Sequence, residues 1–262
     1  MDNNKKSIGQ IINRRDALKL LGVGSAAVLA AFSHQEVSSV NARPTPPPQP
    51  DCLVRPQLPI GPDFVDDQLK RSDIRSDPLD GSVRKGIPLI LTMLLADVSN
   101  KSCKVIEGAR VDLWHCDAMG IYSGVPDRIF NTTGQKFLRG YQLTSAKGVV
   151  QFQTIYPGWY SGRAVHIHFT IRTKGVNGQE YQFTSQFFFE DTLTDQVYKQ
   201  EPYSVKGKRD TRNADDEIFK HGGDQWILRA RGNTISGYRV GMNIGLDLSD
   251  TKAGASDLLG DG

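Results

Sequence analysis

The chain has 262 residues, 38% of them hydrophobic, so it is long enough to bury a core as one all-β domain. Its formal net charge is +3, and removal of residues 1–42, which hold five Lys or Arg and three Asp or Glu, lowers this to about +1. A nearly neutral protein lacks the basic surface of proteins that bind nucleic acid or anionic lipid, so small molecules are the expected partners.

Residues 1–42 have the composition of an export signal. A polar, basic start precedes an apolar run that is too short to span a bilayer. Arg14 and Arg15 begin an RRxxLK pattern, which resembles the twin-arginine signals that export folded proteins; an ordinary secretory signal is the alternative. We expect cleavage near Ala42, a periplasmic or secreted protein without a membrane anchor, and an extended Pro-rich spacer over residues 43–59.

Short strand-like runs separated by turn residues fill the chain from Pro88 onward. The predicted strands are Leu89–Ala96, Ala109–Trp114, Val149–Thr154, Ala164–Arg172, Tyr181–Phe189 and Tyr238–Leu246. The breaks DAMG, SAKG, KGVNG and EDTLTD have turn composition. We therefore expect an all-β antiparallel sandwich with long loops and little helix over residues 60–248. Residues 198–225 predict a polar excursion with at most a short helix, and residues 249–262 a flexible tail.

Three cysteines are present: Cys52, Cys103 and Cys116. They lack the CxxC spacing of zinc ribbons and redox dithiols. In an exported protein two of them can form a disulfide, and the sequence leaves open which two.

Two histidines and two tyrosines suggest a metal site. His166 and His168 alternate within a predicted strand, so both side chains project from one face and can reach one metal ion, as in cupin, copper and zinc sites. Tyr160 lies in a turn shortly before these histidines, and Tyr122 follows a Gly-containing turn after another strand. Two phenolates with two imidazoles form a hard, anionic donor set that favours ferric iron. Such phenols bind only when a strongly charged ion removes their protons.

Three segments of the chain resemble, in order, the intradiol ring-cleavage dioxygenases, the family of the protocatechuate and catechol dioxygenases. They are GARVDLWHCDAMGIYSG, FLRGYQLTSAKGVVQFQTIYPGWYSGRAVHIHF and TSQFFFEDTLTD. The resemblance runs from about Ile60 to Leu248 and is closest to the exported, single-domain branch. It implies one non-haem Fe(III) per chain, no organic cofactor, and cleavage of a catechol-type ring between its hydroxyls with O2 to a cis,cis-muconate-type diacid.

The resemblance also implies roles for individual residues. The family's iron ligands match four positions: Tyr122, Tyr160, His166 and His168. Tyr160 would be the ligand that the substrate displaces, and it would then accept a substrate proton. Arg163 would stabilise charge that develops on the ring. Gln186 would lie near the substrate, after a hairpin that is longer here than in the family.

The chain departs from the family pattern in two places. Family members often carry a Glu-Gly-Pro-aromatic stretch where this chain has PIGPDFVDD, so Pro62, Asp63 and Phe64 are expected to shape the entrance differently. The N-terminal helical region that dimerises the catechol enzymes is missing, which leaves the oligomeric state open, a homo-oligomer included.

Two alternatives to a ferric dioxygenase stay open at this point. One is a copper or zinc enzyme that uses His166 and His168, and the other is a non-enzymatic β-sandwich binding module with a degenerate metal site. His115, Tyr141 and Tyr156 are expected to have structural roles. The sequence does not identify the ring among catechol derivatives.

Overall fold

The computed structural model describes residues 53–250, apart from positions 62, 67, 102 and 127–130. All of these lie in the second of the two units into which the chain divides, Pro47–Gly262. The predicted export signal, the first part of the spacer and most of the predicted tail lie outside the described residues. None of the described helices is both long enough and apolar enough to cross a bilayer.

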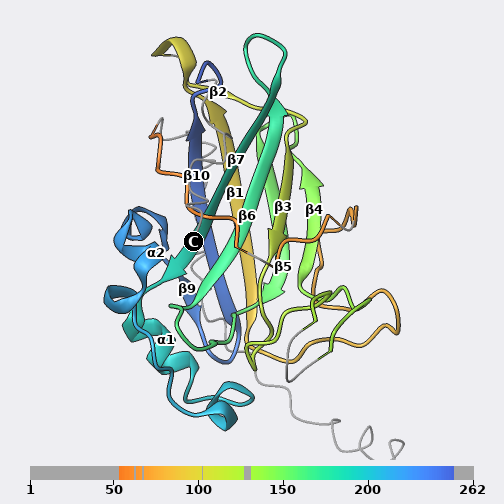
Figure 1. Cartoon of the computed structure of the whole chain (residues 1–262), viewed down its shortest axis with the longest axis vertical. Coiled ribbons are helices and arrows are strands. Elements are labelled where there is room, and N and C mark those ends of the chain that lie inside the picture. Colours follow the sequence, from red (N-terminus) through yellow and green to blue (C-terminus); the bar gives the residue numbers. More distant parts are fainter. Residues whose placement is uncertain (1–52, 62, 67, 102, 127–130, 251–262) are drawn as a thin grey trace, which may run out of the picture. The chain divides into compact units, whose positions relative to one another are not determined.

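Two β-sheets form the described fold (Figure 1). The first has the order β2-β1-β10-β9, with β5 also paired to β1; its strands are β1 (Pro88–Asp97), β2 (Lys104–Val105), β5 (Val149–Ile155), β9 (Arg231–Asn233) and β10 (Gly237–Leu246). The second has the order β4-β3-β6-β7-β8; its strands are β3 (Arg110–Trp114), β4 (Arg139–Leu143), β6 (His166–Lys174), β7 (Glu180–Phe189) and β8 (Ile227–Leu228). The prediction of an all-β sandwich is confirmed, with two parallel pairs, β1 with β10 and β7 with β8, among otherwise antiparallel neighbours.

The six predicted strands correspond to β1, β3, β5, β6, β7 and β10, each within two residues at either end. The short strands β2, β4, β8 and β9 are not predicted, because β2, β8 and β9 have only two or three residues and β4 has no run of apolar or β-branched residues. The break EDTLTD forms a helix, α1 (Asp191–Val197), rather than a turn. The excursion after it contains α2 (Glu217–Lys220) and three short 3-10 turns, so the helix content is small, as expected.

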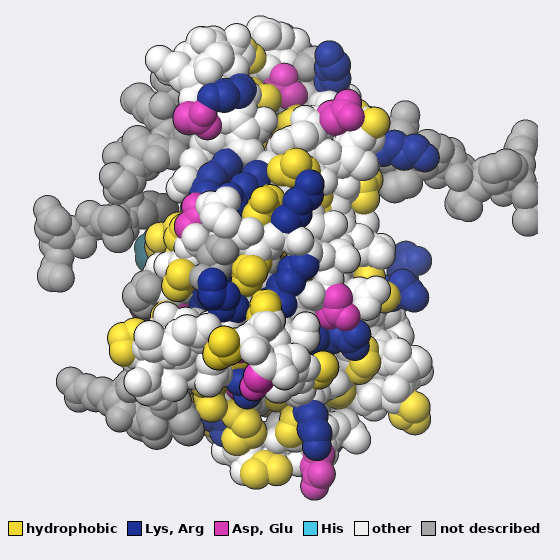
Figure 2. Space-filling view, turned by 90° about the vertical axis from the view of Figure 1, so that its right-hand side faces the viewer, with side chains coloured by type: hydrophobic (Ala, Val, Ile, Leu, Met, Phe, Trp, Pro, Cys, Tyr) yellow, Lys and Arg dark blue, Asp and Glu magenta, His cyan; other side chains and the backbone are white. Residues whose placement is uncertain are grey.

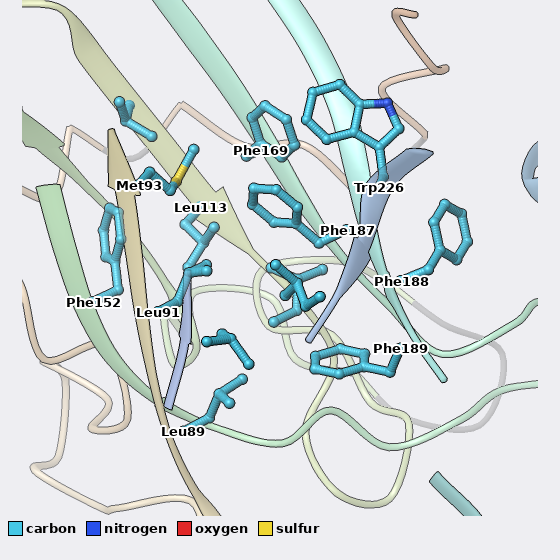
Figure 3. Packing of buried hydrophobic residues seen from close by; sticks show 14 of the residues in the cluster. Leu89, Leu91, Met93, Leu113, Phe152, Phe169, Phe187, Phe188, Phe189 and Trp226 are labelled. Carbon is cyan, nitrogen blue, oxygen red and sulfur yellow. The ribbon is translucent and has the colours of Figure 1, made fainter. Parts of the chain in front are cut away.

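The main core lies between the two sheets. Figure 3 shows Leu91 and Met93 of β1 and Phe152 of β5 on one side of it, with Phe169 of β6 and Phe187 of β7 on the other. Along β5 the burial alternates, as expected for a strand with one face on a core and one in solvent.

Strand β6 is buried on both faces. Ile167 and Phe169 point into the main core, and both are fully buried. His166 and His168 alternate with them, so they point away from the first sheet, and both are nevertheless at most 2% exposed. A second layer of chain must therefore cover this outer face.

The segment that precedes β1 supplies part of that cover. Ion pairs hold this segment in place: Arg110 of β3 and Arg172 of β6 both pair with Asp66, at 2.7 and 3.0 Å. Mixed charges are also common on the surface, since Figure 2 shows Lys and Arg side chains across the middle of one face, with Asp and Glu side chains among them. Each ion pair of Asp66 contributes little stability, but together they fasten the segment around Asp66 to the second sheet. Phe64, two residues earlier, packs on Trp114 with ring centroids 5.0 Å apart.

Candidate metal centre and active site

The candidate site is built on one cross-strand row of the second sheet. Register places Arg139 of β4 opposite Trp114 of β3, Trp114 opposite His168 of β6, and His168 opposite Gln186 of β7. Directly opposite residues share a face of a sheet, so this row lies on the outer face with His166, two residues along β6. Backbone pairing thus fixes the positions of His166, His168 and Gln186, whereas the two tyrosines come from loops.

The four residues predicted as ligands lie together. Tyr160 Oη is 3.1 Å from His166 Nε2, Tyr122 Oη is 3.4 Å from it, and His168 Nε2 is 3.0 Å from it. One imidazole nitrogen has a single lone pair, so three polar atoms around it are better satisfied by a cation that all four donors share. In the part of the chain that the structure describes, no group of three or more His, Cys, Asp and Glu is placed to hold a metal ion. A metal ion held by His166 and His168 would therefore need the tyrosines as further ligands.

The two histidine rings are held by different means. His166 Nδ1 lies 2.6 Å from the carbonyl oxygen of Ala164, and a carbonyl only accepts, so Nδ1 carries the proton and Nε2 presents its lone pair to the site. His168 stacks on Trp114 with centroids 5.0 Å apart and planes 4° from parallel. Its Nδ1 is buried and has no hydrogen-bond partner among the described residues. Hydrogen bonding thus orients His166, and packing orients His168.

Burial shifts the pKa of all four groups toward their neutral forms. It lowers the pKa of His166 to about 3, an effect to which the Arg163 charge adds, and it lowers the pKa of His168 well below its usual range. It raises the pKa of Tyr122 and of Tyr160 above the usual range of a phenol. At neutral pH the imidazoles are therefore free bases that can bind a metal, and the phenols stay protonated until a cation replaces the proton.

The two tyrosines come from loops whose backbones touch. Tyr122 follows β3, and Tyr160 follows β5. Between the loops lies Gly158, where a Cβ would stand 2.5 Å from the carbonyl oxygens of both Asp117 and Ala118. Only glycine allows this approach, so Gly158 is required for the packing of the two loops.

Lys206 joins the same two loops from the excursion. Its Nζ donates to the carbonyl oxygens of Met119 and Trp159, both at 2.6 Å, and lies 4.7 Å from the centre of the Trp159 ring. Because Met119 lies three residues before Tyr122 and Trp159 directly precedes Tyr160, this ammonium joins the backbones of the two loops that carry the phenols.

Arg163 is held beside the ligands by two buried partners. Its Nη2 donates to Gln186 Oε1 at 2.6 Å, and its Nε donates to Asp216 Oδ2 at 2.8 Å. Gln186 Nε2 in turn donates to the carbonyl oxygen of Pro59 at 2.7 Å. The structure therefore brings Gln186 to Arg163, with its amide oxygen and amide nitrogen both engaged.

The segment before β1 closes the site from outside. Gly61 adopts a φ of +75°, and a Cβ there would lie 3.1 Å from His168 Cε1. Ile60 and Phe64 pack with Tyr160 against a buried cluster of Trp114, Cys116 and Tyr122. The site is thus walled by apolar side chains on the face opposite the main core.

The remaining predicted residues have structural roles, as expected. His115 is hydrogen-bonded through both ring nitrogens, to Thr154 Oγ1 at 2.6 Å and to the carbonyl oxygen of Cys116 at 2.8 Å, and burial lowers its pKa to about 4. Tyr156 is fully buried and hydrogen-bonded to Thr194. Cys103 is disulfide-bonded, whereas Cys116 is a buried free thiol.

Sequence reasoning missed Asp216, Lys206 and Gly61. Asp216 stands before a short helical stretch, a position where Asp often caps a helix, and this signal was available. Nothing in the sequence indicates that its other oxygen reaches Arg163, 53 residues earlier. Lys206 gives no signal of its own, since lysines in polar loops are usually solvated.

Comparison with known proteins agrees with this geometry. A family model described as Dioxygenase matches residues 60–207, more than half of the chain. The chlorocatechol 1,2-dioxygenase of Pseudomonas putida is 26% identical over 121 residues, which cover 39% of this chain and 42% of that protein. This chain thus spans less than half the length of that curated relative.

Two solved structures are similar over nearly their whole length. The intradiol ring-cleavage dioxygenase from Tetranychus urticae has 30% sequence identity and a TM-score of 0.65, covering 75% of this chain and 96% of its own. The dioxygenase domain of a dioxygenase carbohydrate-binding protein fusion from the cellulolytic bacterium Streptomyces sp. SirexAA-E has 25% identity and a TM-score of 0.53, covering 74% and 98%. With the family model and these structures in agreement, the chain belongs to the intradiol ring-cleavage dioxygenase family.

Proposed function

We propose that this protein is a non-haem Fe(III) dioxygenase that uses O2 to open a catechol-type ring between its two hydroxyls and gives a cis,cis-muconate-type diacid. The observation that carries the proposal is the convergence of Tyr122, Tyr160 and His168 on His166 Nε2, within 3.4 Å. Family membership supports the reaction class.

The residues present fit a ferric ion. Tyr122 and Tyr160 would supply two anionic oxygens, and His166 and His168 two neutral nitrogens, a set that matches a hard trivalent cation better than zinc or copper. Two phenolates would balance two of the three charges of a ferric ion, and hydroxide or a substrate diolate can supply the rest. When bound, the iron would act as a Lewis acid that orients the diol and withdraws charge from it.

Tyr160 is suited to move and to accept a proton. It is only partly buried, whereas Tyr122 is 7% exposed. It is also followed by a turn at Gly162, where a Cβ would have nothing within 4 Å. Burial raises the pKa of this phenol, so its phenolate oxygen would be a strong base and would take a proton from a substrate hydroxyl.

Arg163 is placed to stabilise negative charge on the ring. Asp216 and Gln186 engage Nε and Nη2, and Nη1 has no hydrogen-bond partner among the described residues. A guanidinium that is already oriented stabilises charge without reorganising when the charge develops. The apolar walls around Phe64 and Trp114 exclude water and strengthen this interaction.

The test is a visible absorption spectrum of purified protein with metal analysis, before and after anaerobic addition of catechol, followed by product analysis in air. We expect about one iron per chain, a broad tyrosinate-to-iron band that shifts on addition of catechol, and a muconate-type product. Tyr122→Phe and Tyr160→Phe should each weaken or shift the band. Tyr141→Phe is the matched control, because Tyr141 lies in β4 and packs under Arg110 away from the ligands.

Each alternative gives a different result in the same experiment. A colourless protein that takes up no iron when iron is offered would exclude the dioxygenase and favour the binding module. Copper or zinc retained by Tyr122→Phe and Tyr160→Phe would indicate an enzyme that relies on His166 and His168 alone.

We propose further that the protein is exported, periplasmic or secreted, through the twin-arginine route. The basis is the pair Arg14 and Arg15 ahead of a short apolar run, in residues outside the described part of the chain. Replacing both arginines by lysine should retain the protein in the cytoplasm, which cell fractionation measures. Unchanged export of this double variant would indicate an ordinary secretory signal.

A further inference from the structure

We propose that Asp216 is a positioning residue of the active site, which orients Arg163 directly and the ligand His166 through the backbone of Ala164. The inference rests on the proposed function, since it takes His166 as a ligand and Arg163 as the residue beside the substrate. Asp216 belongs to the long excursion between β7 and β8 and was not expected from the sequence to have a role.

The carboxylate of Asp216 is completely buried and fully engaged. Its Oδ2 accepts from Arg163 Nε at 2.8 Å and from the backbone nitrogen of Ala164 at 2.7 Å. Its Oδ1 accepts from the backbone nitrogen of Phe219 at 2.9 Å and so caps the first turn of α2. Oδ1 therefore binds the excursion itself, and Oδ2 binds residues of the active site.

The contact with Arg163 fixes the plane of the guanidinium. Gln186 accepts from Nη2 on the next strand, so two buried groups, on two different elements, hold one planar fork. Burying a carboxylate is unfavourable unless it is paired, and Arg163 is its only ion-pair partner among the described residues. Each member of the pair thus confines the other to this geometry.

The contact with Ala164 extends the effect to His166. The nitrogen of Ala164 donates to Asp216, and its carbonyl oxygen accepts from His166 Nδ1 at 2.6 Å. A residue whose backbone is held at both its nitrogen and its carbonyl oxygen cannot rotate away. Asp216 thereby stabilises the tautomer in which His166 Nε2 faces Tyr160. Outer residues that orient a ligand in this way typically change metal affinity or activity 10-fold to 100-fold when mutated.

The decisive variant is Asp216→Ser. Serine is a good helix N-cap, so it can keep the bond to Phe219, but it is too short to reach both Arg163 and Ala164 as well. The control is Asp77→Ser. Asp77 is 2% exposed and accepts from the backbone nitrogens of Leu79 and Lys136, both at 2.9 Å, so it is an equally buried carboxylate that joins loops without touching Arg163.

The first readout needs no metal. In the iron-free protein labelled with 15N-histidine, NMR should find His166 of the wild type as the Nδ1-protonated tautomer, and Asp216→Ser should show a mixture of tautomers. The Asp77→Ser protein should keep the wild-type signal. A wild-type His166 signal in folded Asp216→Ser would overturn the proposal. Where Asp216→Ser does not fold, Asp216→Thr decides, because threonine also caps helices and is equally too short to reach both Arg163 and Ala164.

The second readout uses the iron-loaded protein. Asp216→Ser should shift the visible band and lower kcat for catechol 10-fold to 100-fold, with a smaller change in KM, whereas Asp77→Ser should lose stability and keep the wild-type band and kcat. Equal effects of both variants on the band and on kcat would reduce Asp216 to a structural residue. If the wild type itself binds no iron, the proposed function fails, and the NMR result still decides whether Asp216 orients His166.

Discussion

Replacing Gly61 by alanine should disturb both the fold and the metal centre. Gly61 has a φ of +75°, a conformation that costs a residue with a Cβ about 1–2 kcal/mol. The added methyl would also lie 3.1 Å from His168 Cε1, and overpacking of this kind typically costs about 1–3 kcal/mol. His168 already stacks on Trp114, so its ring has limited room to retreat.

Gly81 provides a matched control for this change. Its φ is +74°, but a Cβ there would have nothing within 4 Å. Gly81→Ala should therefore lower the free energy of unfolding by about 1–2 kcal/mol through backbone strain alone. Gly61→Ala should lower it by about 2–5 kcal/mol, the strain and the crowding together.

Two assays separate the effects. Urea denaturation with an unchanged m-value gives the loss of stability of each variant. Titration of the iron-free protein with ferric ion, followed in the visible band, gives metal affinity, which should fall at least about 10-fold for Gly61→Ala and stay unchanged for Gly81→Ala. If the two variants lost equal stability and bound iron equally well, the inferred contact between Gly61 and His168 would be refuted.

Three further predictions concern stability and reactivity. The pKa of Asp216 is held low, because although burial raises it, the Arg163 charge and its hydrogen bonds outweigh that effect. A group whose folded-state pKa is depressed stabilises the fold above its unfolded-state pKa, here about 3.9, and this contribution is lost as the pH falls through the folded-state pKa. The difference in urea stability between wild type and Asp216→Ser should therefore shrink below about pH 4. A difference that grew there would contradict the reasoning. Phe187→Ala should cost about 3–5 kcal/mol, because Phe187 is fully buried and stacks on Phe169 with centroids 4.3 Å apart; a loss under about 1 kcal/mol in the same assay would count against this packing. Burial raises the pKa of the Cys116 thiol, so a thiol reagent should label it only in urea, and rapid labelling of the native protein would show that the thiol is accessible.

Much of the fold follows from local pattern. Alternation of apolar and polar residues in β5, and the apolar runs of β1, β6 and β7, predict these strands to within two residues. Strand β4, with the sequence RGYQL, carries no such signal. It is a strand because β3 offers it an edge to pair with, and pairing depends on the neighbour rather than on the residues themselves.

The sequence by itself determined that His166 and His168 share a face, because a strand has a period of two. It also placed Tyr122 and Tyr160 next to turns, and the resemblance added Arg163 and Gln186. The tertiary structure decided which distant groups surround them. Asp216, Lys206 and Gly61 reach the site from separate segments. Asp216 acts through Oδ2 and Lys206 through Nζ, and Gly61 leaves room for His168 because it has no Cβ. Such contacts leave no periodic trace in a sequence, because they depend on how far apart two backbones come to rest once the sheets have packed.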